Sequence, residues 1–179
     1  MGERYLITLK VQNLRGHTNT PFNDDFEPDL RAMFLNADKT YVIPGSSIKG
    51  VTRKKALLLS SPGDEEFAEV FGRPGTRQGR VSFGWGYLTR TTLLCKRYGV
   101  AIDRELGVAE SDKLYIFEYL PGTVELRFEV HVLYPLSEGA KRLLSRSLSL
   151  LKYDTIGWGG SRGIGVVEEV MLDDRLVTH

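Results

Sequence analysis

The alternation of apolar and polar residues along the chain marks its clearest strands. Tyr5, Ile7, Leu9 and Val11 alternate with more polar neighbours, which predicts a strand with one apolar face. Residues 124–132, with the sequence VELRFEVHV, show the most regular two-residue period. We therefore expect two amphipathic strands far apart in the sequence, each with one face toward the core.

Two segments have helical periodicity instead. Residues 47–60 follow Ser46 and Ser47, either of which could accept a hydrogen bond as the N-cap, and the spacing predicts that the inward residues are Ile48, Val51 and Leu58. The second helix begins after Ser137 as N-cap, and its core positions are Ala140, Leu143, Leu144, Leu148 and Leu151. A short helical turn is expected over residues 64–71.

The remaining segments complete the order of elements. Residues 80–92 read as a strand interrupted by glycines, residues 96–112 as a projecting hairpin, and residues 114–119 as a strand that ends at the Pro121-Gly122 turn. A strand over residues 164–172 closes the chain. The order β-α-β-β-α-β predicts an α+β, ferredoxin-like (RRM-like) fold with a long first loop over residues 14–38.

Composition is consistent with one soluble domain over residues 1–179. The chain is 41% hydrophobic and 10% aromatic, which is enough for a normal core. A single cysteine, Cys95, excludes an internal disulfide framework. The sequence shows no signal peptide and no long apolar span, so we expect a cytoplasmic protein that does not bind membranes.

Charge is distributed unevenly although the net charge is only +1. Residues 39–63 and 70–102 carry Lys and Arg but no acid, whereas acidic residues gather in residues 24–29 and in the last third. This pattern fits a basic surface for a phosphate backbone, but it also fits charges that point in many directions.

The segment YVIPGSSIKG at residues 41–50 joins a strand, a turn and a basic helix start. Lys49 and Arg53 are positive charges in the first turns, where the helix dipole favours an anion. A phosphate at this position would meet both backbone N–H groups and the lysine. The alternative is an ordinary strand–turn–helix with a solvated basic face.

The segment GWGGSRGIG at residues 157–165, hereafter the glycine-rich loop, contains five glycines in nine residues. A strand follows it, and no Gly-Lys-Ser/Thr ends it, so it is neither a dinucleotide fingerprint nor a Walker loop. Glycine N–H groups and the Arg162 fork suit contact with an RNA backbone. A tight loop that crosses another loop remains the alternative.

Metal ligation by histidine and cysteine is not predicted, because His17, His131, His179 and Cys95 are scattered. The carboxylates Asp24, Asp25 and Asp29 crowd one loop and could hold a divalent cation, or they could form a solvated acidic loop.

Three ordered motifs resemble the RAMP (repeat-associated mysterious protein) superfamily of CRISPR-associated proteins. They are IPGSSIKG at residues 43–50, VAIDRELGVA at residues 100–109 with its continuation to residue 130, and the glycine-rich loop. Together they span residues 41–167. The resemblance is closest to the repeated backbone subunit of type III effector complexes.

This resemblance implies a ferredoxin-like fold and RNA binding. Copies of such a subunit stack along a guide RNA, beside other complex subunits, and hold its backbone; the matching residues here are Ser46, Ser47, Lys49, Arg53, Ser161 and Arg162. The segment from about 96 to 112 corresponds to the family's thumb hairpin, which interrupts the guide–target RNA duplex. Val100, Ile102 and Arg104 are the residues near it.

Cleavage of target RNA is also implied for active members, through an aspartate in the first loop and a divalent metal such as Mg²⁺. Counting back from Pro44 places that catalytic and metal-binding aspartate at Asp29, with Asp24 and Asp25 as alternatives.

Two other functions remain open from the sequence. A guide-processing RAMP endonuclease that acts alone would need an acid/base group such as His17. A non-catalytic RRM-like module would stack bases on exposed aromatics, for which Phe83, Trp85 and Tyr87 are candidates.

Overall fold

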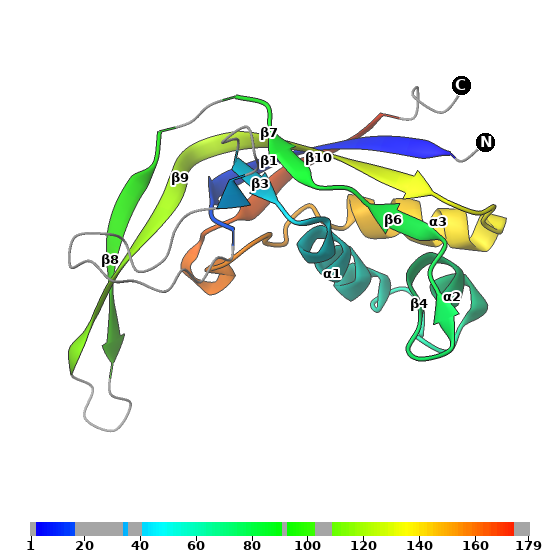
Figure 1. Cartoon of the computed structure of the whole chain (residues 1–179), viewed down its shortest axis with the longest axis horizontal. Helices are drawn as coiled ribbons and strands as arrows, with labels where there is room; N and C mark the ends of the chain where they lie inside the picture. The colour runs from blue at the N-terminus through cyan, green and yellow to red at the C-terminus, as the bar shows by residue number, and fades with distance from the viewer. Residues whose placement is uncertain (1–2, 17–33, 36–40, 91–92, 103–108, 174–179) are drawn as a thin grey trace.

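The structure, a computed structural model, describes residues 3–16, 34–35, 41–90, 93–102 and 109–173. Its elements are β1 (Arg4–Leu14), β2 (Phe34–Leu35), β3 (Tyr41–Ile43), α1 (Gly45–Ala56), α2 (Glu65–Phe71), β4 (Gly72–Arg73), β5 (Arg77–Gln78), β6 (Val81–Phe83), β7 (Gly86–Leu88), β8 (Cys95–Ile102), β9 (Ala109–Val132), α3 (Glu138–Ser149), the 3₁₀ helix η1 (Gly160–Arg162) and β10 (Val166–Asp173). Figure 1 shows their arrangement.

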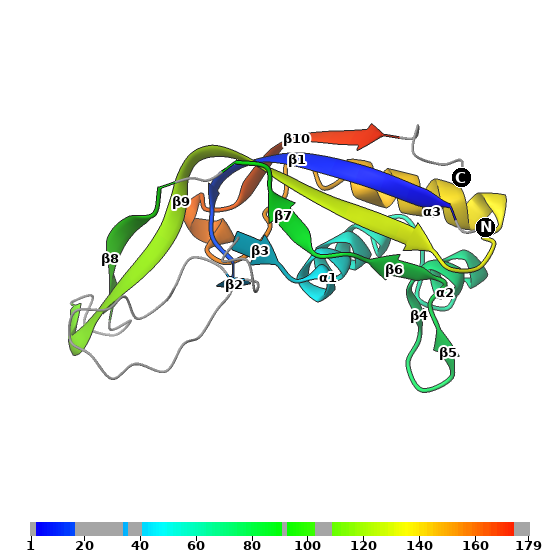
Figure 2. The ribbon, with the colours of Figure 1, turned by 45° about the horizontal axis from the view of Figure 1, so that its top comes forward.

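An antiparallel sheet forms one layer of the molecule. Its strand order is β10-β1-β9-β7-β3-β2, and β6 and β8 also pair with β9. The helices α1, α2 and α3 lie on the same side of the sheet (Figures 1 and 2). With β6 and β7 as one interrupted strand, the elements β1, α1, β6/β7, β9, α3 and β10 form the ferredoxin-like βαββαβ core, which confirms the predicted fold class.

The core lies between the sheet and the helices. Ile7, Leu9 and Val11 on β1 are fully buried, as the two-residue period predicts. The second helix is also confirmed: the Ser137 hydroxyl accepts a hydrogen bond from the Ala140 N–H at 3.2 Å, and the five predicted core positions, Ala140, Leu143, Leu144, Leu148 and Leu151, are buried.

The start and end of the first helix differ from the sequence prediction. Its N-cap is Pro44 without a side-chain cap bond, so Ser46 and Ser47 are exposed first-turn residues rather than caps. Pro44 has the fixed φ that enters a helix directly from β3, and its carbonyl accepts from the Ser47 N–H at 3.0 Å.

The helix α1 also ends at Ala56, four residues earlier than predicted. The next turn is tightened by hydrogen bonds between residues three apart, such as Leu58 N–H to Lys55 carbonyl. This turn leaves Leu58 72% exposed, which contradicts its predicted core position, while Thr52 and Ala56 are fully buried.

The predicted turn at Pro121-Gly122 is wrong. The strand β9 continues through both residues as one 24-residue strand. Gly122 has φ +73°, its N–H donates to the Asn13 side chain at 3.1 Å, and the β1–β9 register shifts between Gln12 and Leu14. A bulge therefore accommodates the proline and glycine without ending the strand.

The strand interruption and the hairpin are present. The Gly84 N–H donates to the Glu129 carbonyl at 2.8 Å between β6 and β7. The strand β8 pairs with the start of β9 from Cys95 opposite Tyr119 to Ile102 opposite Ala109, and this hairpin extends away from the helices (Figures 1 and 2). In the part of the chain that the structure describes, no helix is long and apolar enough to cross a membrane.

Candidate nucleic-acid interface

A groove of about 230 Å³ opens at the N-terminus of α1, and we call it the α1 groove. Its walls come from the helix start, from the stretch that runs from the end of β5 through β6, and from the residue after β9: Gly45, Ser46, Lys49, Gln78, Gly79, Val81, Ser82, Phe83 and Leu133. The structure therefore places two of the predicted RNA-binding residues, Ser46 and Lys49, in one concave site.

Gly45 brings the helix start against the sheet. A Cβ atom at this position would lie 2.1 Å from the Phe83 carbonyl oxygen and 2.8 Å from that of Gly84. Only glycine permits this approach, which points the first turn of α1 into the groove beside β6.

The chemistry of the groove suits an anion. Helix N-termini present N–H groups and the positive end of the dipole, and Lys49 adds a full charge. The first turn of α1 contains no acidic residue, and none of the described residues that line the groove is acidic. The Gln78 and Ser82 side chains are further polar groups that can bind phosphate oxygens.

The other predicted residues on α1 lie outside this groove. Ser47 is exposed in the same turn. The Arg53 guanidinium lies 5.2 Å from the centre of the Phe67 ring, so it packs against α2. Arg53 is thus only partly available for a contact with RNA.

The glycine-rich loop forms a second exposed segment. Its 3₁₀ turn, η1, carries Ser161 and Arg162 on the surface between left-handed glycines at residues 159 and 163. The Arg162 guanidinium lies 5.0 Å from the centre of the Trp158 ring. This arginine is therefore presented against an aromatic surface rather than in an open loop.

Sequence reasoning missed the residues that hold this loop. The backbone N–H of Trp158 donates to the Arg15 carbonyl at 2.9 Å. The Arg15 side chain is buried, and its guanidinium lies 4.0 Å from the centre of the Trp158 ring and 5.5 Å from the centre of the Phe117 ring. The end of β1, the base of the β8–β9 hairpin and the glycine-rich loop therefore meet in one cluster. No local pattern could reveal it, since its members are far apart in the sequence.

An ion pair joins α1 to the segment before the loop. The Lys55 ammonium lies 2.6 Å from the Asp154 carboxylate, and both side chains are mostly buried. Burial raises the pKa of Asp154, but the hydrogen bonds from Lys55 and the Thr155 N–H and the charges of Lys55 and Lys54 outweigh it, so the pKa lies below its usual value. The basic helix and the glycine-rich loop are thereby tied together.

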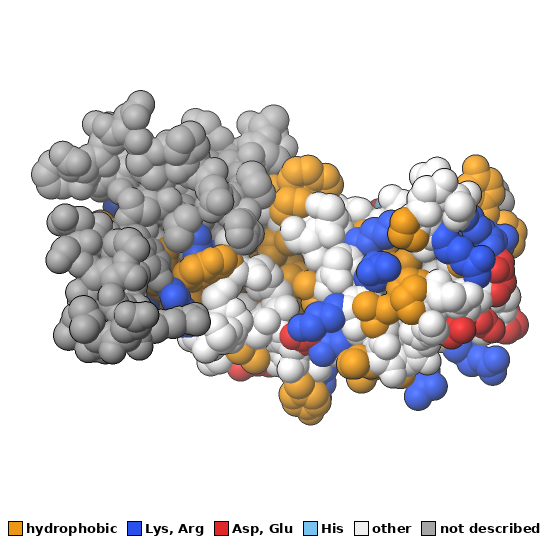
Figure 3. Space-filling view, turned by 90° about the horizontal axis from the view of Figure 1, so that it is seen from below, with side chains coloured by type: hydrophobic (Ala, Val, Ile, Leu, Met, Phe, Trp, Pro, Cys, Tyr) orange, Lys and Arg blue, Asp and Glu red, His pale blue; other side chains and the backbone are white. Residues whose placement is uncertain are grey.

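The helix-covered face carries several Lys and Arg side chains. In Figure 3, Lys and Arg side chains lie over the middle of this face beside hydrophobic side chains, and others lie at the end formed by α2 and the start of α3. Most acidic side chains on it lie toward the end formed by α2 and the start of α3. Basic side chains are therefore spread over this face, and the acidic residues within 24–29 lie outside the described part of the chain.

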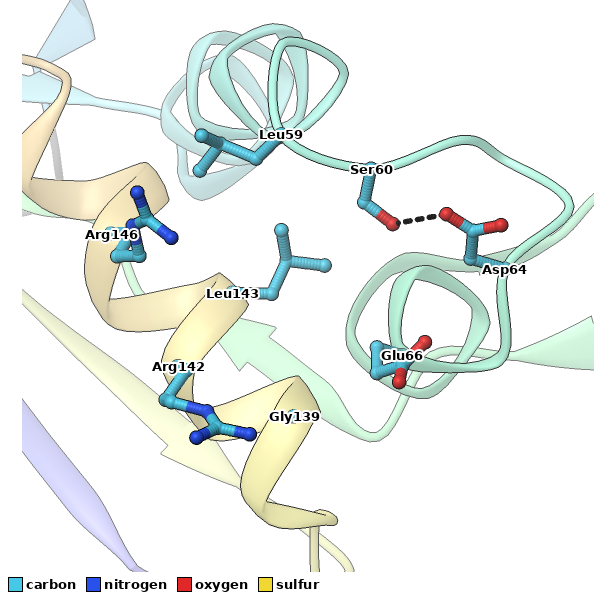
Figure 4. A pocket seen from close by; sticks show the side chains of 8 residues that line it. All are labelled: Leu59, Ser60, Asp64, Glu66, Gly139, Arg142, Leu143 and Arg146. Carbon is cyan, nitrogen blue, oxygen red and sulfur yellow. Dashed lines mark hydrogen bonds between the residues drawn. The ribbon is translucent and has the colours of Figure 1, made fainter.

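A larger cavity, of about 330 Å³, lies between α2 and α3 (Figure 4). Its charged side chains are Arg142 and Arg146 on one wall and Asp64 and Glu66 on the other. The Ser60 hydroxyl donates to Asp64 at 2.8 Å. The two carboxylates in its wall would repel the phosphates of an RNA, so the α1 groove is the better candidate for RNA binding.

The three aromatic candidates for base stacking differ in how exposed they are. Phe83 packs against Phe71, with ring centres 6.4 Å apart, and belongs to the edge of the core. Trp85 and Tyr87 are 49% and 47% exposed. Only the latter two can contact a base.

The predicted catalytic residues lie outside the described part of the chain. This applies to Asp24, Asp25 and Asp29 and to the thumb residue Arg104. Val100 and Ile102 lie on β8, and Val100 is 48% exposed. Among the described residues, no group of three or more His, Cys, Asp or Glu side chains could hold a metal ion.

Comparison with known proteins assigns the family. The model of the RAMP superfamily matches residues 25–168, which is most of the chain, and the protein belongs to this superfamily. A search of curated proteins gives no match.

A solved structure shares the fold. The protein is similar to a chain of the type III-B Cmr-beta assembly, solved by cryo-EM bound to cognate target RNA, with a TM-score of 0.66 and 16% identity. The match covers 95% of this chain and 61% of that chain, so the protein spans less than two thirds of its structural relative.

Proposed function

We propose that this protein is a guide-RNA-binding subunit of a type III CRISPR interference complex in the cytoplasm. The α1 groove carries the proposal: a helix N-terminus, Lys49 and polar side chains line it, and its described lining residues include no acid. Membership of the RAMP superfamily and the fold shared with a chain of an RNA-bound Cmr-beta assembly support it.

In this function, the RNA backbone passes the α1 groove and the glycine-rich loop. Phosphate oxygens accept hydrogen bonds from the first turn of α1 and from Lys49, and the Arg162 fork binds a second phosphate. The Asp154–Lys55 pair and the Arg15–Trp158 contact keep the two segments in fixed positions. Binding is then directed to the backbone rather than to base sequence.

Copies of the subunit stack along the guide RNA, and other complex subunits bind beside them. The β8–β9 hairpin serves as the thumb, and its exposed Tyr98 and Val100 contact the guide–target duplex. Cleavage of target RNA by some copies, through Asp29 and a divalent metal such as Mg²⁺, is a further part of the proposal.

Removing Lys49 and Arg162 tests the binding proposal. Each of the variants Lys49→Ala and Arg162→Ala is expected to weaken binding of a guide-length single-stranded RNA about tenfold, since each loses one charge-assisted phosphate contact. Fluorescence anisotropy over a range of salt concentrations measures this, and the magnitude of the slope of log K against log salt should fall by about 0.7 per residue, as for a single-stranded nucleic acid.

Arg142→Ala is the matched control. It removes the same charge from the cavity between α2 and α3, and we expect RNA affinity and salt slope close to those of the parent protein. Equal losses in all three variants would indicate a general charge effect and would contradict the assigned interface.

The cleavage proposal is tested in the assembled complex. We expect Asp29→Ala to reduce guide-dependent cleavage of target RNA in Mg²⁺ about a hundredfold or more, with unchanged guide-RNA affinity. Asp24→Ala and Asp25→Ala are the comparison variants, and cleavage that persists in Asp29→Ala but disappears in either of these would reassign the catalytic residue.

A further inference from the structure

Tyr153 has a strained backbone and an exposed ring. Its φ is +70°, in the left-handed region that residues other than glycine, asparagine and aspartate rarely adopt. Among the described residues with positive φ, seven are glycines and one is Asn13, so Tyr153 is the exception in that group. Its side chain is 83% exposed.

Folding does not account for this tyrosine. The residue lies three positions after Leu150, the right-handed C-cap of α3, and glycine is the residue that adopts a left-handed backbone without strain. Its backbone N–H donates to the Val167 carbonyl at 3.0 Å, and glycine would make the same hydrogen bond. Because the ring is exposed, burial does not compensate for the strain. The side chain is therefore kept for a contact outside this chain.

The surroundings of Tyr153 favour a nucleic acid. The Lys152 ammonium lies 4.9 Å from the centre of the ring, and the neighbouring Asp154 is paired with Lys55 and Lys54. Glu169 acts electrostatically on Lys152, but it is itself paired with Lys10 at 2.6 Å. A cation beside an exposed ring suits a base stacked on the ring with its phosphate on the lysine.

Position in the fold supports the same partner. Tyr153 is bonded through its backbone to β10 and directly precedes Asp154, which joins α1 to the start of the glycine-rich loop. The ring therefore lies beside the connection between the two segments that we assign to the RNA backbone.

We propose that Tyr153 is a stacking platform for one base of the bound RNA, with Lys152 holding the adjacent phosphate. The inference rests on the proposed RNA-binding function and adds a base contact to its backbone contacts. Stacking on an aromatic side chain tolerates any base, so the platform adds affinity and register rather than sequence specificity.

Glycine at position 153 separates the role of the ring from that of the backbone. We expect Tyr153→Gly to weaken binding of a single-stranded RNA oligonucleotide about tenfold, with an unchanged salt slope. Its melting temperature should be equal to that of the parent or up to about 4 °C higher, since glycine relieves the strained φ. Tyr153→Phe keeps the ring and should bind like the parent.

Two controls sharpen the measurement. Tyr134→Ala removes a tyrosine that is 66% exposed at the opposite end of α3, in a cavity with Glu3 and Lys141, and should leave RNA affinity unchanged. An oligonucleotide with abasic sites in place of bases should bind the parent and Tyr153→Gly equally, because no base remains to stack.

The outcomes are distinguishable. If the parent binds no RNA, the proposed function fails and the platform with it. If the parent binds RNA and Tyr153→Gly binds equally well, only the platform is overturned; loss of co-purifying protein subunits in that variant would then assign Tyr153 to a protein interface. A weakening that persists on abasic RNA would also overturn base stacking.

Discussion

Gly157→Ala is expected to destabilise the protein by about 3–4 kcal/mol and to lower its melting temperature by about 10 °C. Gly157 has φ +85°, and a Cβ atom there would lie 1.9 Å from the Arg15 carbonyl oxygen. That carbonyl accepts the hydrogen bond from the Trp158 N–H, so the loop must move away from β1 to relieve the contact. RNA affinity should fall as Arg162 loses its position.

The matched variant is Gly163→Ala. Gly163 is also left-handed, at φ +71°, but a Cβ atom there would have no neighbour within 4 Å. It should cost only the strain of the left-handed region, about 1–2 kcal/mol. Thermal unfolding of both variants measures the difference, and equal destabilisation would show that the close approach to Arg15 contributes nothing.

The parts of the fold that could be predicted from sequence are those that local patterns determine. Ile7, Leu9 and Val11 on β1 are buried because alternate residues of a strand share one face, here the face toward the helices, although Thr8 between them is buried as well. The Ser137 cap needs only residues three positions apart. The sequence predicts two strands where the structure has β9, because a proline and a glycine usually end a strand. Its continuity depends on Asn13, which is 109 residues away from Gly122.

The candidate site, like the fold, could be predicted from the sequence only where local patterns determine it. Lys49 could be assigned from a basic helix start, but Gln78, Ser82 and Leu133 join it only because the sheet brings β6 and the end of β9 to that point. Arg53 is expected at the RNA from the sequence, and instead its guanidinium packs on the Phe67 ring of α2. A sequence pattern identifies which helix turn is basic, whereas tertiary packing decides which of its side chains remain available.

Gly45→Ala tests how the α1 groove is built. Alanine in the first turn of a helix usually stabilises, but here a Cβ atom would lie 2.1 Å from the Phe83 carbonyl oxygen. The clash is with backbone, so α1 must shift away from β6, and we expect a loss of about 2–3 kcal/mol with weaker RNA binding.

Gly50→Ala, in the same helix, should do the opposite. A Cβ atom at Gly50 would have no neighbour within 4 Å, so alanine should add about 1 kcal/mol through helix propensity and leave RNA affinity unchanged. The two substitutions are chemically identical and five residues apart, so their difference reports the contact between the helix start and β6. If Gly45→Ala is as stable as Gly50→Ala and binds RNA as tightly, the helix does not abut the strand in solution and the groove does not form the anion site.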